Sequence, residues 1–117
     1  MDFYSKICYI SCMESTHDGT FWTVDFSGKA VKQARKLPGD ILGRLYALKL
    51  DLEHKGPEQP SWRNYGLIVG GKDVHHCHLN SGRPRYVVVW KVIDREICII
   101  EIRYVGPHGS VDYGRFK

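Results

Sequence analysis

The chain has 117 residues, of which 43% are hydrophobic and 26% charged, a composition that fits one globular domain with a core of its own. No apolar run approaches the roughly 18 residues of a membrane helix, and the N-terminus lacks a basic region followed by an apolar signal core. We therefore expect a cytoplasmic protein with no membrane contact. The net charge of +4 at pH 7 favours an acidic or polyanionic partner without identifying one.

The cysteines are scattered along the chain, at Cys8, Cys12, Cys77 and Cys98. This scatter favours reduced thiols over a disulfide framework. Cys77 is expected to be a buried thiol, because the spacing gives it no recognisable histidine oriented by an acid. Cys98 stands among isoleucines and is expected in the core.

The start of the chain differs in pattern from the rest. Residues 1–19 show no sustained period, and we interpret them as an N-terminal extension that is either mobile or an added edge strand. Residues 20–117 are expected to form the single domain. Within it, the aromatic and β-branched stretch Phe21–Phe26 predicts a first strand.

Two helices are predicted next. Apolar residues recur at helical spacing between basic ones, at Ala30, Val31, Ala34 and Leu37, which indicates a short helix with a basic outer face. Asp40 is the expected N-cap of a longer helix that ends at Lys55, before Gly56 and Pro57. The apolar stripe of this helix is Ile41, Leu45, Leu48 and Leu52. A link at Pro38-Gly39 makes the two helices a hairpin.

The remainder of the chain is typical of β-structure. The predicted strands are Trp62–Val69, Val74–Leu79, Tyr86–Ile93 and Ile97–Val105. Short turns between them predict antiparallel neighbours, and the nearly all-apolar Tyr86–Ile93 predicts a central strand covered on both faces. The order β-α-α-β-β-β-β thus predicts an α+β domain with a mainly antiparallel sheet of four to five strands and the helical hairpin packed on one face.

Three histidines and a cysteine stand together at residues 75–78. On a strand, His76 and His78 project from one face, while His75 and Cys77 project from the other. The cluster therefore cannot close a four-ligand metal shell by itself, although a distant ligand such as His108 would complete one. We expect no metal and no cofactor, and we interpret the histidines as proton carriers near neutral pH.

The string HHCHLNSGRPRYVVVWKVIDREICIIEIRYVGPHGSVDY, after a helical hairpin and a Trp62-containing segment, resembles the RelE/ParE superfamily of bacterial toxin-antitoxin toxins. It is most similar to the RelE-like branch of cytotoxic translational repressors. The resemblance covers residues 21–113 and implies a microbial RNase-like fold. It further implies a metal-independent endoribonuclease that cleaves mRNA in the ribosomal A site, by attack of a ribose 2′-hydroxyl on the adjacent phosphate. The implied partners are mRNA, the ribosome and a cognate antitoxin, and the implied assembly is a homodimer or a toxin–antitoxin hetero-oligomer.

This resemblance implies a role for each candidate site residue. One of His76 and His78 would be the general base and the other an electrostatic helper, and Arg85 would stabilise the phosphate. His108 would protonate the leaving 5′-oxygen, and Tyr113 would stack on a base or orient the phosphate. Three further cations are expected to bind RNA or phosphate: Arg83, Arg103 and Lys72.

Other interpretations of the same residues stay open. Simple RelE-like sequences carry the arginine nearer the position of Val87, so that Arg85 or Arg83 would have to reach in as a substitute. The histidines can instead be occupants of a strand face, and Tyr113 a tail residue packed on the sheet. The chain can also be a ParE-like toxin that binds and inhibits DNA gyrase without catalysis, or a catalytically weak homologue that keeps its antitoxin contact.

Overall fold

The structure of the chain, a computed structural model, describes residues 21–116, so the interpretation of residues 1–19 concerns residues outside it. The elements are β1 (Thr23–Phe26), α2 (Gly28–Ala34), α3 (Gly39–Lys55), β2 (Gly66–Leu67), β3 (Val74–His78), β4 (Tyr86–Asp94), β5 (Ile99–Pro107) and two 3-10 turns, η1 (His108–Ser110) and η2 (Tyr113–Phe116). The predicted order β-α-α-β-β-β-β is confirmed. In the described residues, no helix combines the length and apolarity needed to cross a membrane.

The strands form one sheet in the order β1-β5-β4-β3-β2. All neighbours are antiparallel except β1 and β5, which run parallel. The chain between them contains both helices and the other three strands. β4 lies at the centre, and its residues Val87–Trp90 have no exposed surface. The predicted central strand covered on both faces is therefore confirmed.

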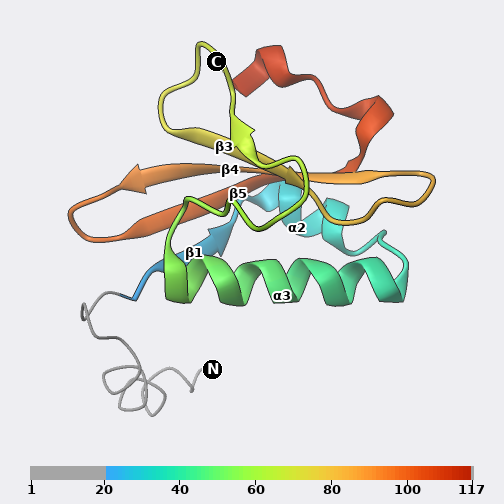
Figure 1. Ribbon diagram of the computed structural model, residues 1–117, viewed down its shortest axis with the longest axis horizontal. Helices are drawn as coiled ribbons and strands as arrows, with labels where there is room; N and C mark the ends of the chain where they lie inside the picture. The colour runs from blue at the N-terminus through green and yellow to red at the C-terminus, as the bar shows by residue number, and fades with distance from the viewer. Residues whose placement is uncertain (1–20, 117) are drawn as a thin grey trace.

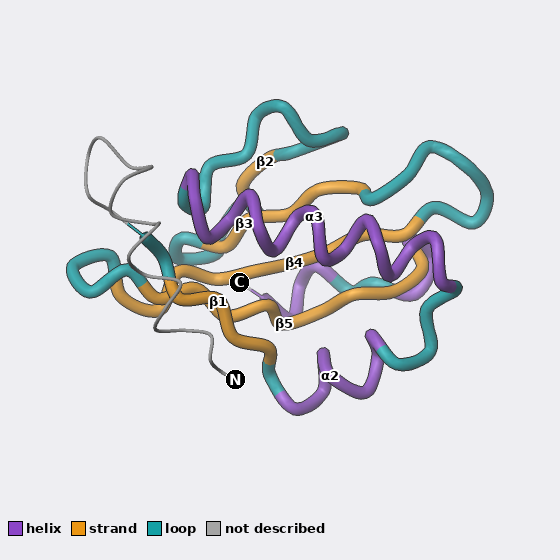
Figure 2. The backbone as a smooth tube through the Cα atoms, turned by 90° about the horizontal axis from the view of Figure 1, so that it is seen from below, coloured by secondary structure: helices purple, strands orange, loops and turns teal. Residues whose placement is uncertain are grey.

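One face of the sheet is covered by the two helices. The predicted stripe of α3 is buried in a single cluster with Ala30 of α2 and with Val88, Trp90 and Ile100 of the sheet. Figures 1 and 2 show α3 lying over the sheet roughly in the direction of β4, while α2 lies beside β5. Since both helices contribute to one cluster, the expected helical hairpin on one face is confirmed.

The C-terminal segment, residues 108–116, covers part of the opposite face. Val111, Tyr113 and Phe116 pack there against a second cluster, formed by Ile68, Val74, Val87, Val89 and Tyr104. Figure 1 shows this segment above the sheet and α3 below it. The two faces therefore differ: a helical layer closes one, and a short irregular segment partly covers the other.

The ends of the helices show how the sequence sets them. Ser27 caps α2, since its Oγ accepts a hydrogen bond of 3.1 Å from the backbone N–H of Ala30. The expectation that Asp40 caps α3 is wrong, because α3 begins at Gly39 and Pro38 occupies the N-cap position without a side-chain bond. Asp40 is the second residue of α3, where its negative charge interacts favourably with the positive end of the helix dipole.

Three other predictions need correction. Of the predicted strand Trp62–Val69 only Gly66–Leu67 pairs in the sheet, because residues 60–64 form turns. β5 begins at Ile99 rather than Ile97, after a turn of residues 95–98. Cys98 lies in that turn with φ of 57° and is only half-buried, whereas Cys77 is a buried free thiol as predicted.

Candidate active site

The alternation along β3 separates its polar side chains. His75 and Cys77 point into the helix-covered face, where the His75 ring stacks on Trp90 with centroids 5.8 Å apart. His76 and His78 point to the opposite face, where each contacts a residue of the C-terminal segment. The prediction that the two pairs occupy different faces is confirmed.

His78 lies against His108, with ring centroids 5.3 Å apart in an edge-to-face arrangement. His108 is placed there by the end of β5, and its backbone N–H donates a 2.7 Å hydrogen bond to the carbonyl oxygen of Arg85. His78 is 8% exposed and His108 is exposed. The pair thus joins a shielded imidazole and an open one, as two proton carriers with different roles require.

Two arginines lie beside His108 at the rim. Arg83 and Arg85 line a hollow of about 290 Å³ together with Pro84, His108 and Gly109. Burial lowers the pKa of His78, and the positive charges of His108 and Arg85 lower it further. His78 is therefore neutral at pH 7 and able to accept a proton, while the arginines beside it offer donors to a phosphate.

His76 lies under Tyr113, with ring centroids 5.4 Å apart. Its Nδ1 is buried and has no hydrogen-bond partner among the described residues, and burial lowers its pKa. Tyr113 packs on the second cluster, where burial raises the pKa of its phenol. A raised pKa makes Tyr113 a poor acid at pH 7, so its geometry favours packing and positioning.

Val87 lies on the same face, opposite His78 in the register of β3 and β4. Its side chain has no exposed surface, so an arginine at this position would emerge from the floor of the site. Arg85 lies directly before β4 and is exposed, and it lines the same hollow as His108. Arg85 is thus the cation that the sheet presents beside the histidines.

The three further cations expected to bind RNA or phosphate lie in different parts of the structure. Arg83 lies at the rim with Arg85. Arg103 forms a 2.8 Å ion pair with Glu101 and lines a different hollow. Lys72 lies in the turn before β3, at the opposite end of that strand from His78.

Sequence reasoning did not single out Arg63, whose carbonyl oxygen accepts a 2.8 Å hydrogen bond from the backbone N–H of His78. Its positive charge also helps to lower the pKa of His78. The signal was its place directly after Trp62, in a segment predicted to lie near β3. The turn that replaced the predicted strand is what brings it there.

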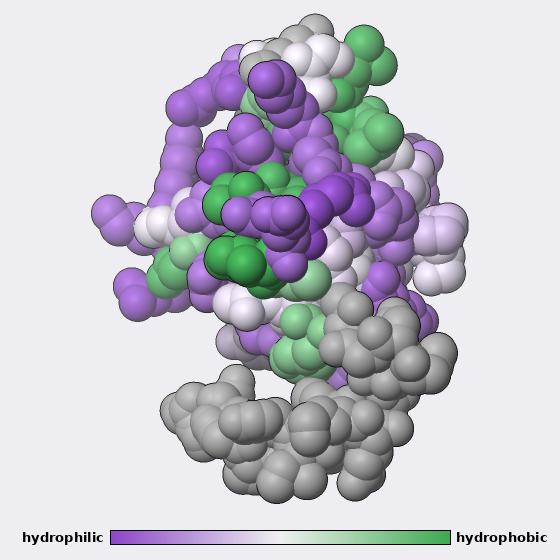
Figure 3. Space-filling model, turned by 90° about the vertical axis from the view of Figure 1, so that its left-hand side faces the viewer, coloured by the Kyte–Doolittle hydropathy of each residue, from purple (hydrophilic) through white to green (hydrophobic). Residues whose placement is uncertain are grey.

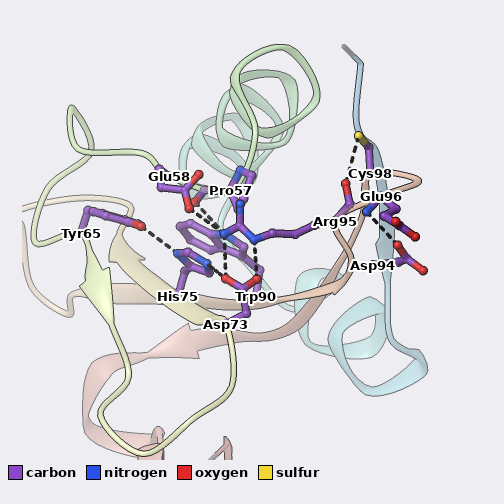
Figure 4. Close-up of polar contacts among 10 residues, drawn as sticks. All are labelled: Pro57, Glu58, Tyr65, Asp73, His75, Trp90, Asp94, Arg95, Glu96 and Cys98. Atoms are coloured by element: carbon purple, nitrogen blue, oxygen red, sulfur yellow. Dashed lines mark hydrogen bonds and ion pairs between the residues drawn. The ribbon is translucent and has the colours of Figure 1, made fainter.

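Among the described residues, the side chains close enough together to hold a metal ion lie away from this site. They are Glu58, Asp73 and His75. These groups already engage one another and Arg95, as Figure 4 shows. Arg95 binds Glu58 at 2.7 Å and Asp73 at 2.7 Å, and both ring nitrogens of His75 are used, by Asp73 at 2.8 Å and by Tyr65 at 2.7 Å. A cation would have to displace the Arg95 guanidinium.

These features define a class of protein: an α+β domain with two helices on one sheet face and a basic histidine site on the other. No family model matches the chain, and no curated protein does. Solved structures do match, and they show that the chain has the RelE toxin fold.

Three of these structures give the extent of the likeness. A mutant of the Escherichia coli toxin RelE in the free state has a TM-score of 0.64 and 22% identity, covering 83% of this chain and 94% of that one. The RelE–RelB complex of Pyrococcus horikoshii has a TM-score of 0.60 and 19% identity over 79% of this chain and 100% of that chain. The RelBE2 toxin–antitoxin complex of Mycobacterium tuberculosis has a TM-score of 0.55 and 20% identity over 78% and 95%.

Proposed function

We propose that the chain is a RelE-like toxin, an endoribonuclease that cleaves mRNA on the ribosome in the cytoplasm and so inhibits translation. The observation that supports this most is the His78–His108 pair beside Arg85, on the sheet face that the helices leave open. A base, an acid and a phosphate-binding cation are the groups that transfer of a phosphoryl group to a ribose hydroxyl requires.

The proposed roles of these residues are as follows. Neutral His78 accepts the proton of the 2′-hydroxyl, whose oxygen attacks the adjacent phosphorus and forms a 2′,3′-cyclic phosphate. The bond from phosphorus to the 5′-oxygen breaks, and protonated His108 gives that oxygen a proton. Arg85 binds the phosphate oxygens, whose charge grows in the transition state. His76, which packs under Tyr113, helps to position this pair of histidines.

A cognate antitoxin is the proposed protein partner. Among the structures of the same fold, those from Pyrococcus horikoshii and Mycobacterium tuberculosis are complexes of a toxin with its antitoxin. We extend this property to the present chain, which would then exist in a toxin–antitoxin hetero-oligomer.

The experiment that tests the proposal is a map of mRNA 5′-ends after brief induction of the chain. The wild type is expected to produce new ends within codons. His108→Ala is expected to reduce the number of these ends at least about 100-fold, since it removes the acid. His54→Ala, which changes an exposed histidine near the end of α3, is the matched control and retains cutting.

Damaged DNA together with intact mRNA after wild-type induction would contradict the proposal and favour gyrase inhibition. A second candidate has support from Val87, which leaves the floor of the site without a cation: the chain can be a catalytically weak homologue. That function predicts tight antitoxin binding with no new mRNA ends even in the wild type.

A further inference from the structure

A second and larger hollow lies next to the candidate active site, on the other side of η1. It measures about 590 Å³, and its walls come from α2, the second half of β5 and the C-terminal segment. β1 pairs with β5 only as far as Ile102. Beyond that residue β5 is paired with β4 on one edge, and its other edge has no strand beside it in the described residues. α2 takes that place, and the side-chain oxygen of Gln33 accepts a 3.1 Å hydrogen bond from the backbone N–H of Val105.

The charge of this hollow is positive. Its charged lining residues are four cations and one carboxylate: Lys29, Lys36, Arg103, Arg115 and Asp112. Arg103 is partly neutralised by its ion pair with Glu101, and Asp112 accepts a 3.0 Å hydrogen bond from the backbone N–H of Gly114. Within residues 21–116, no ion pair engages Lys29, Lys36 or Arg115. The hollow is therefore suited to a polyanion.

Aromatic side chains line the same hollow as these cations. Tyr86, Tyr104 and Phe116 line the hollow, and the Tyr104 hydroxyl is held by a 3.0 Å hydrogen bond to the carbonyl oxygen of Pro107. Cations interleaved with aromatic rings are typical of surfaces that bind single-stranded nucleic acid, because phosphates pair with the cations and bases stack on the rings. The face in Figure 3 shows hydrophobic side chains in small groups among hydrophilic ones. Ile93 of β4 and Ile97 of the turn after it are among the exposed large hydrophobic residues, and neither lines the hollow.

The hollow and the candidate active site share η1 as a common wall. Pro107 and Ser110 line the larger hollow, whereas His108 and Gly109 line the smaller one. We propose that the larger hollow binds the segment of single-stranded mRNA next to the scissile phosphate, with phosphates on Lys36 and Arg115 and a base against an aromatic ring. This inference rests on the proposed function and adds to it the path of the substrate across η1.

The test measures binding apart from cleavage. The probe is a short, fluorescent, single-stranded RNA in which every 2′-hydroxyl is methylated, so that the nucleophile is absent and the full chain cannot cut it. Lys36→Glu and Arg115→Glu are each expected to lower its affinity about tenfold, measured by fluorescence anisotropy. Each is also expected to make the plot of log affinity against log salt shallower by about 0.7.

Lys32→Glu is the matched control, because Lys32 is an exposed cation of α2 that does not line the hollow. It is expected to keep the affinity of the wild type, and circular dichroism confirms the fold of each variant. An equal loss in Lys32→Glu, or no loss in Lys36→Glu and Arg115→Glu, overturns the inference.

An acidic peptide whose binding depends on Lys36 and Arg115, while the methylated RNA binds all variants equally, would overturn it too and assign the hollow to a protein. Failure of the proposed function is a separate result: the wild type then leaves mRNA uncut on induction, whatever the affinity of the methylated RNA.

Discussion

At the scale of single residues, the environment of His78 separates it from the other histidines of the site. It is almost fully buried, it contacts His108, and the charges of Arg85 and Arg63 reach it. All of these disfavour its protonated form, and the pKa therefore lies below the ordinary value. A base of this kind keeps its proton-accepting form in mildly acidic solution.

The dependence of cleavage on pH follows from this shift. We expect single-turnover cleavage of ribosome-bound mRNA to decline as the pH falls through the lowered pKa of His78, so that the midpoint of the decline lies below the ordinary histidine value of about 6.5. Arg85→Gln removes one positive charge, which raises that pKa and moves the decline to higher pH. A decline centred above about 6.5 in the wild type would exclude His78 as the base.

At the scale of secondary structure, α3 shows how glycine can have opposite effects within and after one helix. Gly43 lies inside α3 with open space around it. Gly56 follows the last turn with φ of 91°, and a Cβ there would lie 3.0 Å from the indole nitrogen of Trp22. The first glycine destabilises the helix, and the second permits the turn after it. In that turn the carbonyl oxygen of Pro57 accepts a 3.1 Å hydrogen bond from Nε1 of Trp90 in β4.

Alanine at these two positions is therefore expected to act in opposite directions. Gly43→Ala should raise the free energy of unfolding by about 0.5–1 kcal/mol, because alanine loses less backbone entropy in a helix. Gly56→Ala should lower it by at least about 1–3 kcal/mol, through backbone strain and the contact with Trp22. Urea denaturation of both variants measures the difference, and a stable Gly56→Ala protein would show that the turn tolerates a side chain.

At the scale of the whole molecule, Asp73 connects parts of the fold that are distant in sequence. It binds His75 of β3 and Arg95 of the β4–β5 turn, and Arg95 also binds Glu58 beyond α3. The hydrogen bond from Arg95 holds the pKa of Asp73 below its usual value. The sign follows: this contribution to stability is present above the ordinary pKa of Asp73 and is lost as the pH falls through the lowered one.

Removal of the two partners is expected to have unequal effects. Asp73→Ala should lower the free energy of unfolding by about 1–3 kcal/mol, because it leaves a ring nitrogen of the buried His75 without its partner. Arg95→Gln should cost about 1 kcal/mol or less, since the Arg95 side chain is 49% exposed and water replaces the ion pairs. Urea denaturation at neutral pH compares the two, and an Arg95→Gln variant less stable than Asp73→Ala would contradict this order.

The sequence by itself determined the elements and the faces. The alternation of residues 75–78 placed His76 and His78 on one side of a strand, and the stripe of α3 and the apolar run of β4 predicted the core. Such patterns are local, because a strand or a helix repeats over a few residues and burial selects the apolar positions. The prediction from sequence was wrong where the chain forms a turn instead of a strand, as at Trp62 and Cys98.

Only the tertiary structure decided which of these residues meet. His78 and His108 are 30 positions apart, and they come together because β5 returns beside β4 and η1 is held to Arg85. The same folding moved Lys72 to the far end of β3 and gathered Lys36 and Arg115 around one hollow. Contacts of this kind depend on strand register and on the route of the chain across the sheet, which no short segment of sequence contains.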